Sequence, residues 1–142
     1  MSLFSSEMEI TIPFFDVDPM NIVWHGNYIK YLEQARCDMF TKLNYTYIDM
    51  SKDFYAYPIA KMNTKYIKPI SFNDVIIIKS ELLTIEPALN IKYTMYNKKD
   101  NEKIFTAETM QIAVDIRTKE SIYNAPDKLK KILENINEKQ IL

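Results

Sequence analysis

Apolar and polar residues alternate along residues 8–15. One face carries Met8, Ile10, Ile12 and Phe14, and the other begins with Glu9 and Thr11. A period of two residues is typical of a half-buried β-strand. Pro13 cannot donate a backbone hydrogen bond, so it indicates an edge strand or a strand end.

The period changes to that of an α-helix over residues 28–43. A helical projection gathers the apolar side chains on one side: Tyr28, Ile29, Tyr31, Leu32, Ala35, Met39, Phe40 and Leu43. The opposite side carries Lys30, Gln34, Asp38 and Thr41. Because the apolar arc covers about half the circumference, it predicts a helix embedded in a concave surface.

After an irregular segment at residues 44–55, the sequence reads mostly as strands. It predicts four more strands, at residues 57–67, 75–85, 89–97 and 103–116. Turn-forming and charged residues separate these strands, and the run at 98–101 predicts a hairpin. A final amphipathic helix is expected at residues 126–137, with Pro126 in its first turn.

This order of elements predicts a single α+β domain spanning residues 1–142. A curled antiparallel five-stranded sheet wrapped around the long helix, with a short C-terminal helix, would bury the wide apolar arc. A β-grasp or ferredoxin-like domain could use much of the same order. The order alone therefore leaves the choice of fold open.

Composition narrows the functional classes. The 18 Lys and Arg residues nearly balance 19 Asp and Glu residues, so no global field favours nucleic acid or an anionic membrane. The single Cys37 excludes an intramolecular disulfide, and no apolar run approaches the roughly 20 residues of a membrane helix. No start typical of a signal peptide is visible, so we expect a cytoplasmic protein.

The only glycine, Gly26, directly follows the only histidine, His25. Phosphate-binding loops and dinucleotide-binding turns need several glycines, so the sequence excludes both classes. At Gly26 itself, the missing side chain is expected to let a substrate carbonyl approach the backbone.

Two carboxylates, Asp16 and Asp18, join His25 in the turn before the long helix. The first amides of a helix are unpaired and lie at the positive end of its dipole, so they stabilise a developing oxyanion. Asp18 is therefore a candidate base or nucleophile. An amide near residues 25–27 is the candidate oxyanion donor.

The same residues allow simpler interpretations. The aspartates could only shape a turn, with Asn27 as the helix N-cap. His25 could be a partly buried residue beside Trp24 whose hydrogen bonds are satisfied. We expect no metal site, because His25 and Cys37 lack a recognised ligand spacing.

Residues 14–36, FFDVDPMNIVWHGNYIKYLEQAR, resemble the signature of the 4-hydroxybenzoyl-CoA thioesterase family and of Tol-Pal-associated acyl-CoA thioesterases. The matching positions are Asp16, Asp18, Val23, His25, Asn27, Tyr28, Glu33 and Arg36. Residues 66–74 resemble a second landmark of the family, in which Tyr and Pro precede Asp. The chain departs from the family at Met20 and Asn21, where relatives often carry small residues including glycine.

The resemblance implies a hotdog fold whose protomers pair their sheets in a dimer or tetramer, with active sites at the dimer interface. It implies hydrolysis of an acyl-CoA thioester, with no cofactor and with CoA as part of the substrate. By position, Asp18 is the catalytic carboxylate and the N–H of His25 polarises the thioester oxygen. Gly26 and Tyr28 are expected to contact the substrate.

Arg36 lies within the apolar arc of the long helix. A buried guanidinium needs a partner, because an isolated buried charge is very costly. Asp16 or Glu33 could supply that partner. In that arrangement Arg36 would hold the turn of the two aspartates against the helix.

Lys65 and Lys68 follow one another closely in a segment that also contains Tyr66. We expect both lysines to contact the substrate, since CoA carries phosphates that ammonium groups bind and an adenine ring that meets aromatic rings. The simpler alternative is a solvated strand face whose lysines extend into water.

Two other functions remain open at this stage. A hotdog dehydratase acting on hydroxyacyl thioesters would form a double bond without releasing a thiol. A non-catalytic acyl-CoA-binding module would bind the same compound without turnover. The sequence identifies neither the acyl group nor the thiol carrier.

Overall fold

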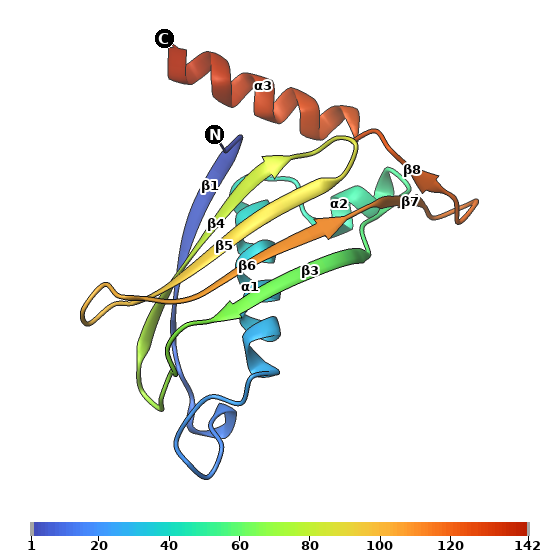
Figure 1. Cartoon of the computed structure of the whole chain (residues 1–142). Coiled ribbons are helices and arrows are strands. Elements are labelled where there is room, and N and C mark those ends of the chain that lie inside the picture. The colour runs from blue at the N-terminus through green and yellow to red at the C-terminus, as the bar shows by residue number, and fades with distance from the viewer. Residues whose placement is uncertain (1, 142) are drawn as a thin grey trace.

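A curved five-stranded antiparallel sheet forms the body of the protein (Figure 1). The computed structural model describes residues 2–141. The strands are β1 (Phe4–Thr11), β3 (Ile59–Tyr66), β4 (Val75–Thr84), β5 (Leu89–Asn97) and β6 (Lys103–Gln111). Their order across the sheet is β1-β4-β5-β6-β3. The predicted hairpin at residues 98–101 joins β5 to β6 and is confirmed.

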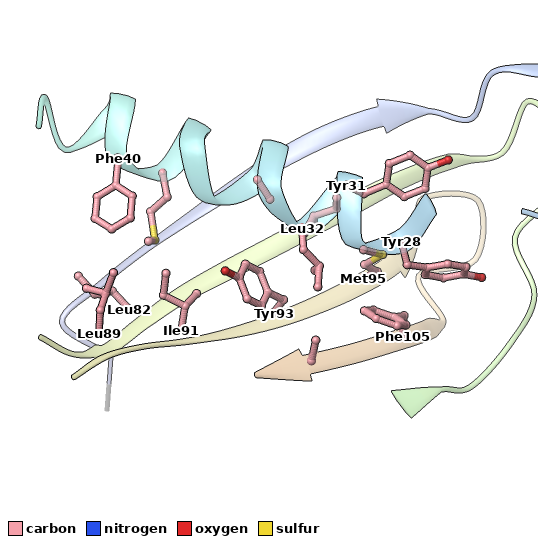
Figure 2. Close-up of a cluster of buried hydrophobic side chains, with 14 of the residues drawn as sticks. Tyr28, Tyr31, Leu32, Phe40, Leu82, Leu89, Ile91, Tyr93, Met95 and Phe105 are labelled. Atoms are coloured by element: carbon pink, nitrogen blue, oxygen red, sulfur yellow. The ribbon is translucent and has the colours of Figure 1, made fainter. Parts of the chain in front are cut away.

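The long helix α1 (Asn27–Lys42) lies on one face of this sheet. Its buried residues are Tyr28, Tyr31, Leu32, Ala35, Arg36, Met39 and Phe40. Figure 2 shows Leu32 between the helix and the strands, close to Tyr93 of β5. The helix begins and ends within one residue of its predicted bounds, and the predicted hotdog arrangement of a long helix wrapped by five antiparallel strands is confirmed.

Shorter elements complete the chain. The segment expected to be irregular contains α2 (Tyr47–Lys52) and β2 (Tyr55–Ala56). β2 joins β7 (Ala113–Asp115) and β8 (Ser121–Ile122) in a second, three-stranded sheet, so the strand predicted at residues 103–116 is divided in two. α3 (Asp127–Ile141) is longer than predicted.

The first strand ends earlier than predicted. β1 stops at Thr11, and Phe14–Asp16 form a single 3-10 turn, η1. Phe14, which was expected on the buried face, is 72% exposed. Pro13 explains the change, because it has no N–H with which to continue the strand ladder.

The start of α1 and the final helix lie at opposite ends of the molecule. Figure 1 shows the turn between β1 and α1 at one end of the sheet, and α3 together with the beginning of β1 at the other. Leu129 and Leu133 of α3 are buried there, and Lys130 pairs with Glu86 after β4 at 2.9 Å. None of the helices within residues 2–141 combines the length and apolarity needed to cross a membrane.

Candidate active site

Asp18 is held in a tight turn by its own backbone and side chain. Its N–H donates to the carbonyl of Ile22 at 2.8 Å, and Oδ1 accepts hydrogen bonds from the N–H groups of Met20 at 2.8 Å and Ile22 at 3.2 Å. Asn21 has a φ of 63°, a left-handed conformation that Asn tolerates better than most residues. Asn21 can therefore form this turn in place of the small residue or glycine expected from the family resemblance.

The second carboxylate oxygen of Asp18, Oδ2, makes no hydrogen bond within residues 2–141. One oxygen thus fixes the side chain while the other keeps its lone pairs for a substrate or water. The side chain is half-buried. This is a suitable arrangement for a carboxylate that must be rigid and still reach solvent.

The start of α1 supplies unpaired backbone donors. Gly26 is the N-cap and no side chain caps the helix. In the part of the chain that the structure describes, the N–H groups of His25 and Gly26 donate to no acceptor. Asn27 is therefore the first helical residue and not the N-cap that the simpler interpretation expected. Its side-chain amide donates to the carbonyl of Asp16 at 2.8 Å.

Packing explains why residue 26 is glycine, which the sequence did not reveal. Its φ of −66° is ordinary for any residue, so glycine is not needed for backbone freedom. A Cβ at this position would lie 2.3 Å from Cζ3 and 2.4 Å from Cη2 of Trp24. The indole ring therefore fills the space that a side chain would occupy at residue 26, which is a structural reason for glycine at this position.

An open hollow of about 370 Å³ brings most of the predicted residues together. This site hollow is lined by Asp18, Ile22, Val23, Trp24, His25, Tyr28, Tyr66, Ile67, Lys68 and Pro69. The turn, the start of α1 and the segment after β3 thus meet at one place. Trp24 and Tyr66 were not predicted as site residues, although Tyr66 belongs to the second sequence landmark.

Aromatic rings form one wall of the site hollow. The Tyr28 ring packs against Tyr66 with a centroid distance of 4.9 Å and against Phe105 at 4.8 Å. Figure 2 shows Tyr28 and Phe105 facing one another near the start of the helix. Burial raises the pKa of Tyr28 to about 12, with a further contribution from Tyr66, so its hydroxyl stays protonated at neutral pH.

The two predicted substrate lysines do not lie together. Lys68 lines the site hollow and pairs with Glu102, which raises the pKa of its ammonium group. Lys65 lines a different hollow of about 420 Å³ that also contains Lys92 and Lys103. The two lysines are separated because Lys65 lies within β3, whereas Lys68 lies beyond the end of that strand at Tyr66.

Asp16 supports the turn through partners other than Arg36. Its buried carboxylate accepts hydrogen bonds from the hydroxyl of Tyr31 at 2.7 Å and from Nζ of Lys30 at 3.1 Å. Burial and the hydrogen bond to Asp16 raise the pKa of Tyr31. The turn is therefore fastened to the first two turns of α1, as expected, but by these two side chains.

Arg36 is buried one turn further along the helix. Its Nη1 donates to the Tyr93 hydroxyl at 3.3 Å, and Nη2 lies 3.9 Å from the exposed carboxylate of Glu33. Its Nε is buried and has no hydrogen-bond partner among residues 2–141. Of the two predicted partners, only Glu33 lies within ion-pair distance, and Arg36 has no bond to Asp16.

Comparison with known proteins places the chain in a family. The sequence profile of the thioesterase-like superfamily matches residues 12–136. YneP of Bacillus subtilis (strain 168), provisionally named an acyl-CoA thioesterase, is 30% identical over 73 residues. That match spans 51% of this chain and 53% of YneP, so it covers about half of each protein.

Two longer matches agree with it. The acyl-CoA thioester hydrolase YbgC of Escherichia coli O6:H1 is 21% identical over 106 residues, which are 75% of this chain and 79% of YbgC. A solved DHNA-CoA thioesterase from Staphylococcus aureus is 27% identical and superimposes with a TM-score of 0.81, covering 96% of this chain and 95% of that one. The chain belongs to the thioesterase-like superfamily.

Proposed function

We propose that this protein hydrolyses an acyl-CoA thioester to a free acid and CoA, with Asp18 as the catalytic carboxylate. One observation carries the proposal: Asp18, with an oxygen free of protein hydrogen bonds, lines the same hollow as His25, whose N–H is unpaired within the described residues. A carboxylate and an oxyanion donor that share one cleft can together carry out thioester hydrolysis. The thioesterase names of the relatives support the same substrate class.

Two routes use this geometry. As a nucleophile, the Asp18 carboxylate adds to the thioester carbon, the CoA thiolate leaves and takes a proton, and water hydrolyses the acyl anhydride. As a base, Asp18 removes a proton from water, whose oxygen adds to the same carbon before the thiolate leaves. In both routes the negative carbonyl oxygen is stabilised by backbone N–H groups at the positive end of α1.

The Asp18→Asn variant tests the proposal. The amide retains the shape of the side chain and loses both nucleophilicity and basicity, so kcat for thiol release should fall by about a hundredfold or more. Asp127→Asn, at the start of α3 at the other end of the sheet, is the matched control and should retain full activity. Undiminished turnover in the Asp18 variant would exclude the proposed role.

The same assay separates the rival functions. Free thiol is expected from a thioesterase, a new double bond without thiol from a dehydratase, and tight binding without turnover from a binding module. A panel of aromatic and aliphatic acyl-CoA compounds should be used, because the protomer alone does not define the acyl group. A CoA-linked substrate also fits the cytoplasmic location that the sequence favours.

We also propose that two protomers pair through β3. This strand forms an edge of the sheet, and every residue in it except Met62 is exposed. An exposed edge strand of eight residues has unpaired backbone groups that can pair with a strand of another chain. Tyr66, at the end of β3, lines the site hollow, so a second protomer on this edge would lie beside the hollow and could complete it.

A further inference from the structure

Tyr66 reaches from the last position of β3 to the start of α1. Its hydroxyl donates a hydrogen bond to the backbone carbonyl of His25 at 3.1 Å. The ring is held edge-on by Tyr28 at 4.9 Å and by Phe105 at 5.0 Å. The phenol is therefore positioned by packing and can direct its hydroxyl at one peptide group.

The carbonyl of His25 and the N–H of Gly26 belong to the same peptide unit. A hydrogen bond to the carbonyl oxygen draws electron density from the nitrogen and makes the N–H a stronger donor. The Gly26 N–H has no acceptor within residues 2–141 and lies at the positive end of α1. The Tyr66 hydroxyl thus acts on one of the two amides suited to bind an oxyanion.

We propose that Tyr66 is a positioning residue for the reaction: its hydroxyl orients and polarises the His25–Gly26 peptide, so that the Gly26 N–H donates to the thioester oxyanion together with the N–H of His25. This inference rests on the proposed thioesterase activity. It assigns Tyr66 no direct contact with the substrate. The Trp24 ring, packed over Gly26, covers one side of this peptide and strengthens the effect by excluding water.

Kinetics of Tyr66→Phe provide the first test. The variant keeps the ring and its packing and removes only the hydroxyl. Because loss of a direct oxyanion donor costs about a hundredfold or more, loss of an indirect polarising bond should lower kcat by about tenfold while KM stays unchanged. Tyr123→Phe removes an exposed hydroxyl elsewhere and should change neither. Unchanged kcat, or a change confined to KM, would overturn the inference.

A second test does not depend on activity. The chain has one histidine and one glycine, and they are adjacent, so labelling with carbonyl-¹³C histidine and ¹⁵N glycine marks a single peptide group. Loss of the hydrogen bond in Tyr66→Phe should move the His25 carbonyl and the Gly26 amide proton upfield. Tyr123→Phe should leave both resonances in place.

The two readouts distinguish failure of the inference from failure of the proposed function. If the labelled peptide is unaffected by Tyr66→Phe, the inference is wrong whatever happens to turnover. If the resonances move as expected and wild-type protein releases no thiol from any acyl-CoA, the contact stands but the catalytic role is refuted together with the proposed function.

Discussion

Trp24 and Gly26 depend on one another for their positions. A methyl group at residue 26 would collide with the indole ring of Trp24. Trp24 is 56% exposed and has room to move. Gly26→Ala should therefore displace Trp24 towards water, with a loss of stability of about 1 kcal/mol because alanine is also a poorer N-cap. Trp24 is the only tryptophan, so a red shift in intrinsic fluorescence reports the movement.

A double-mutant cycle isolates this contact. In a Trp24→Leu background the smaller side chain should tolerate the methyl group, and Gly26→Ala should cost less in urea unfolding. Equal costs in both backgrounds, with no fluorescence change in the single variant, would show that the two residues are independent.

Sequence predicted the local part of the site and, among its long-range partners, Lys68 but not Tyr66. Asp18, His25 and Tyr28 lie within a few positions of one another, so a turn followed by a helix brings them to one hollow. Helical projection placed Arg36 on the buried side correctly, but an angle around the helix does not say which strand residue it will meet. Its contact with Tyr93 spans 57 positions and follows only from the sheet order.

The elements that the sequence identified best are those with long, regular patterns. The wide apolar arc predicted α1, and strand-like runs bounded by turn formers predicted β4 and β5 almost to the residue. The short helix α2 was missed because six residues are too few to show a helical period. Its capping box, Thr46 with Asp49, is the local signal that could have revealed it.

Arg36 joins α1 to the sheet by filling space more than by charge. Nε has no partner in the described part of the chain and Glu33 is mostly exposed. A methionine of similar length should therefore pack in place of Arg36 at little cost, as for other buried ions. Arg36→Ala should instead leave a cavity and destabilise the protein by about 3 kcal/mol.

Urea denaturation of the two Arg36 variants measures this difference. Glu33→Ala is the matched control and should be nearly neutral, because the exposed end of the pair contributes little. A large loss in Arg36→Met, comparable to that in Arg36→Ala, would show that the charge itself is required.

Buried tyrosines make the whole molecule sensitive to alkali. Burial raises the pKa of Tyr28 and of Tyr47 to about 12. A tyrosine in the unfolded chain has a pKa of about 10. The stability due to these neutral hydroxyls is complete below the unfolded pKa and is lost as pH rises towards the folded pKa. The urea midpoint should therefore fall between about pH 10 and 12.

Tyr28→Phe should flatten this alkaline decline, because it removes one group that must ionise on unfolding. Tyr123→Phe, at an exposed position, should leave the decline unchanged. An identical pH profile in wild type and in the Tyr28 variant would contradict the assignment.

Pairing through β3 makes a prediction about assembly. A lysine in place of Ile59, on the exposed edge, would put a charge against the partner strand, where it loses contact with water, so Ile59→Lys should weaken the dimer by about tenfold or more. Ile48→Lys, on the exposed side of α2, is the control. Sedimentation velocity over a dilution series would show the shift, and a wild-type protein that sediments as a monomer throughout would contradict the proposed pairing.

The start of α1 and the helix α3 lie at opposite ends of the molecule, and this decides where a label can be attached. A purification tag, a fluorophore or a surface linker joined after α3 or before β1 would stand at the far end of the sheet from Asp18. Such an attachment should not hinder access of a bulky CoA compound to the site hollow. A protein immobilised in this way would present the site hollow to the surrounding solution.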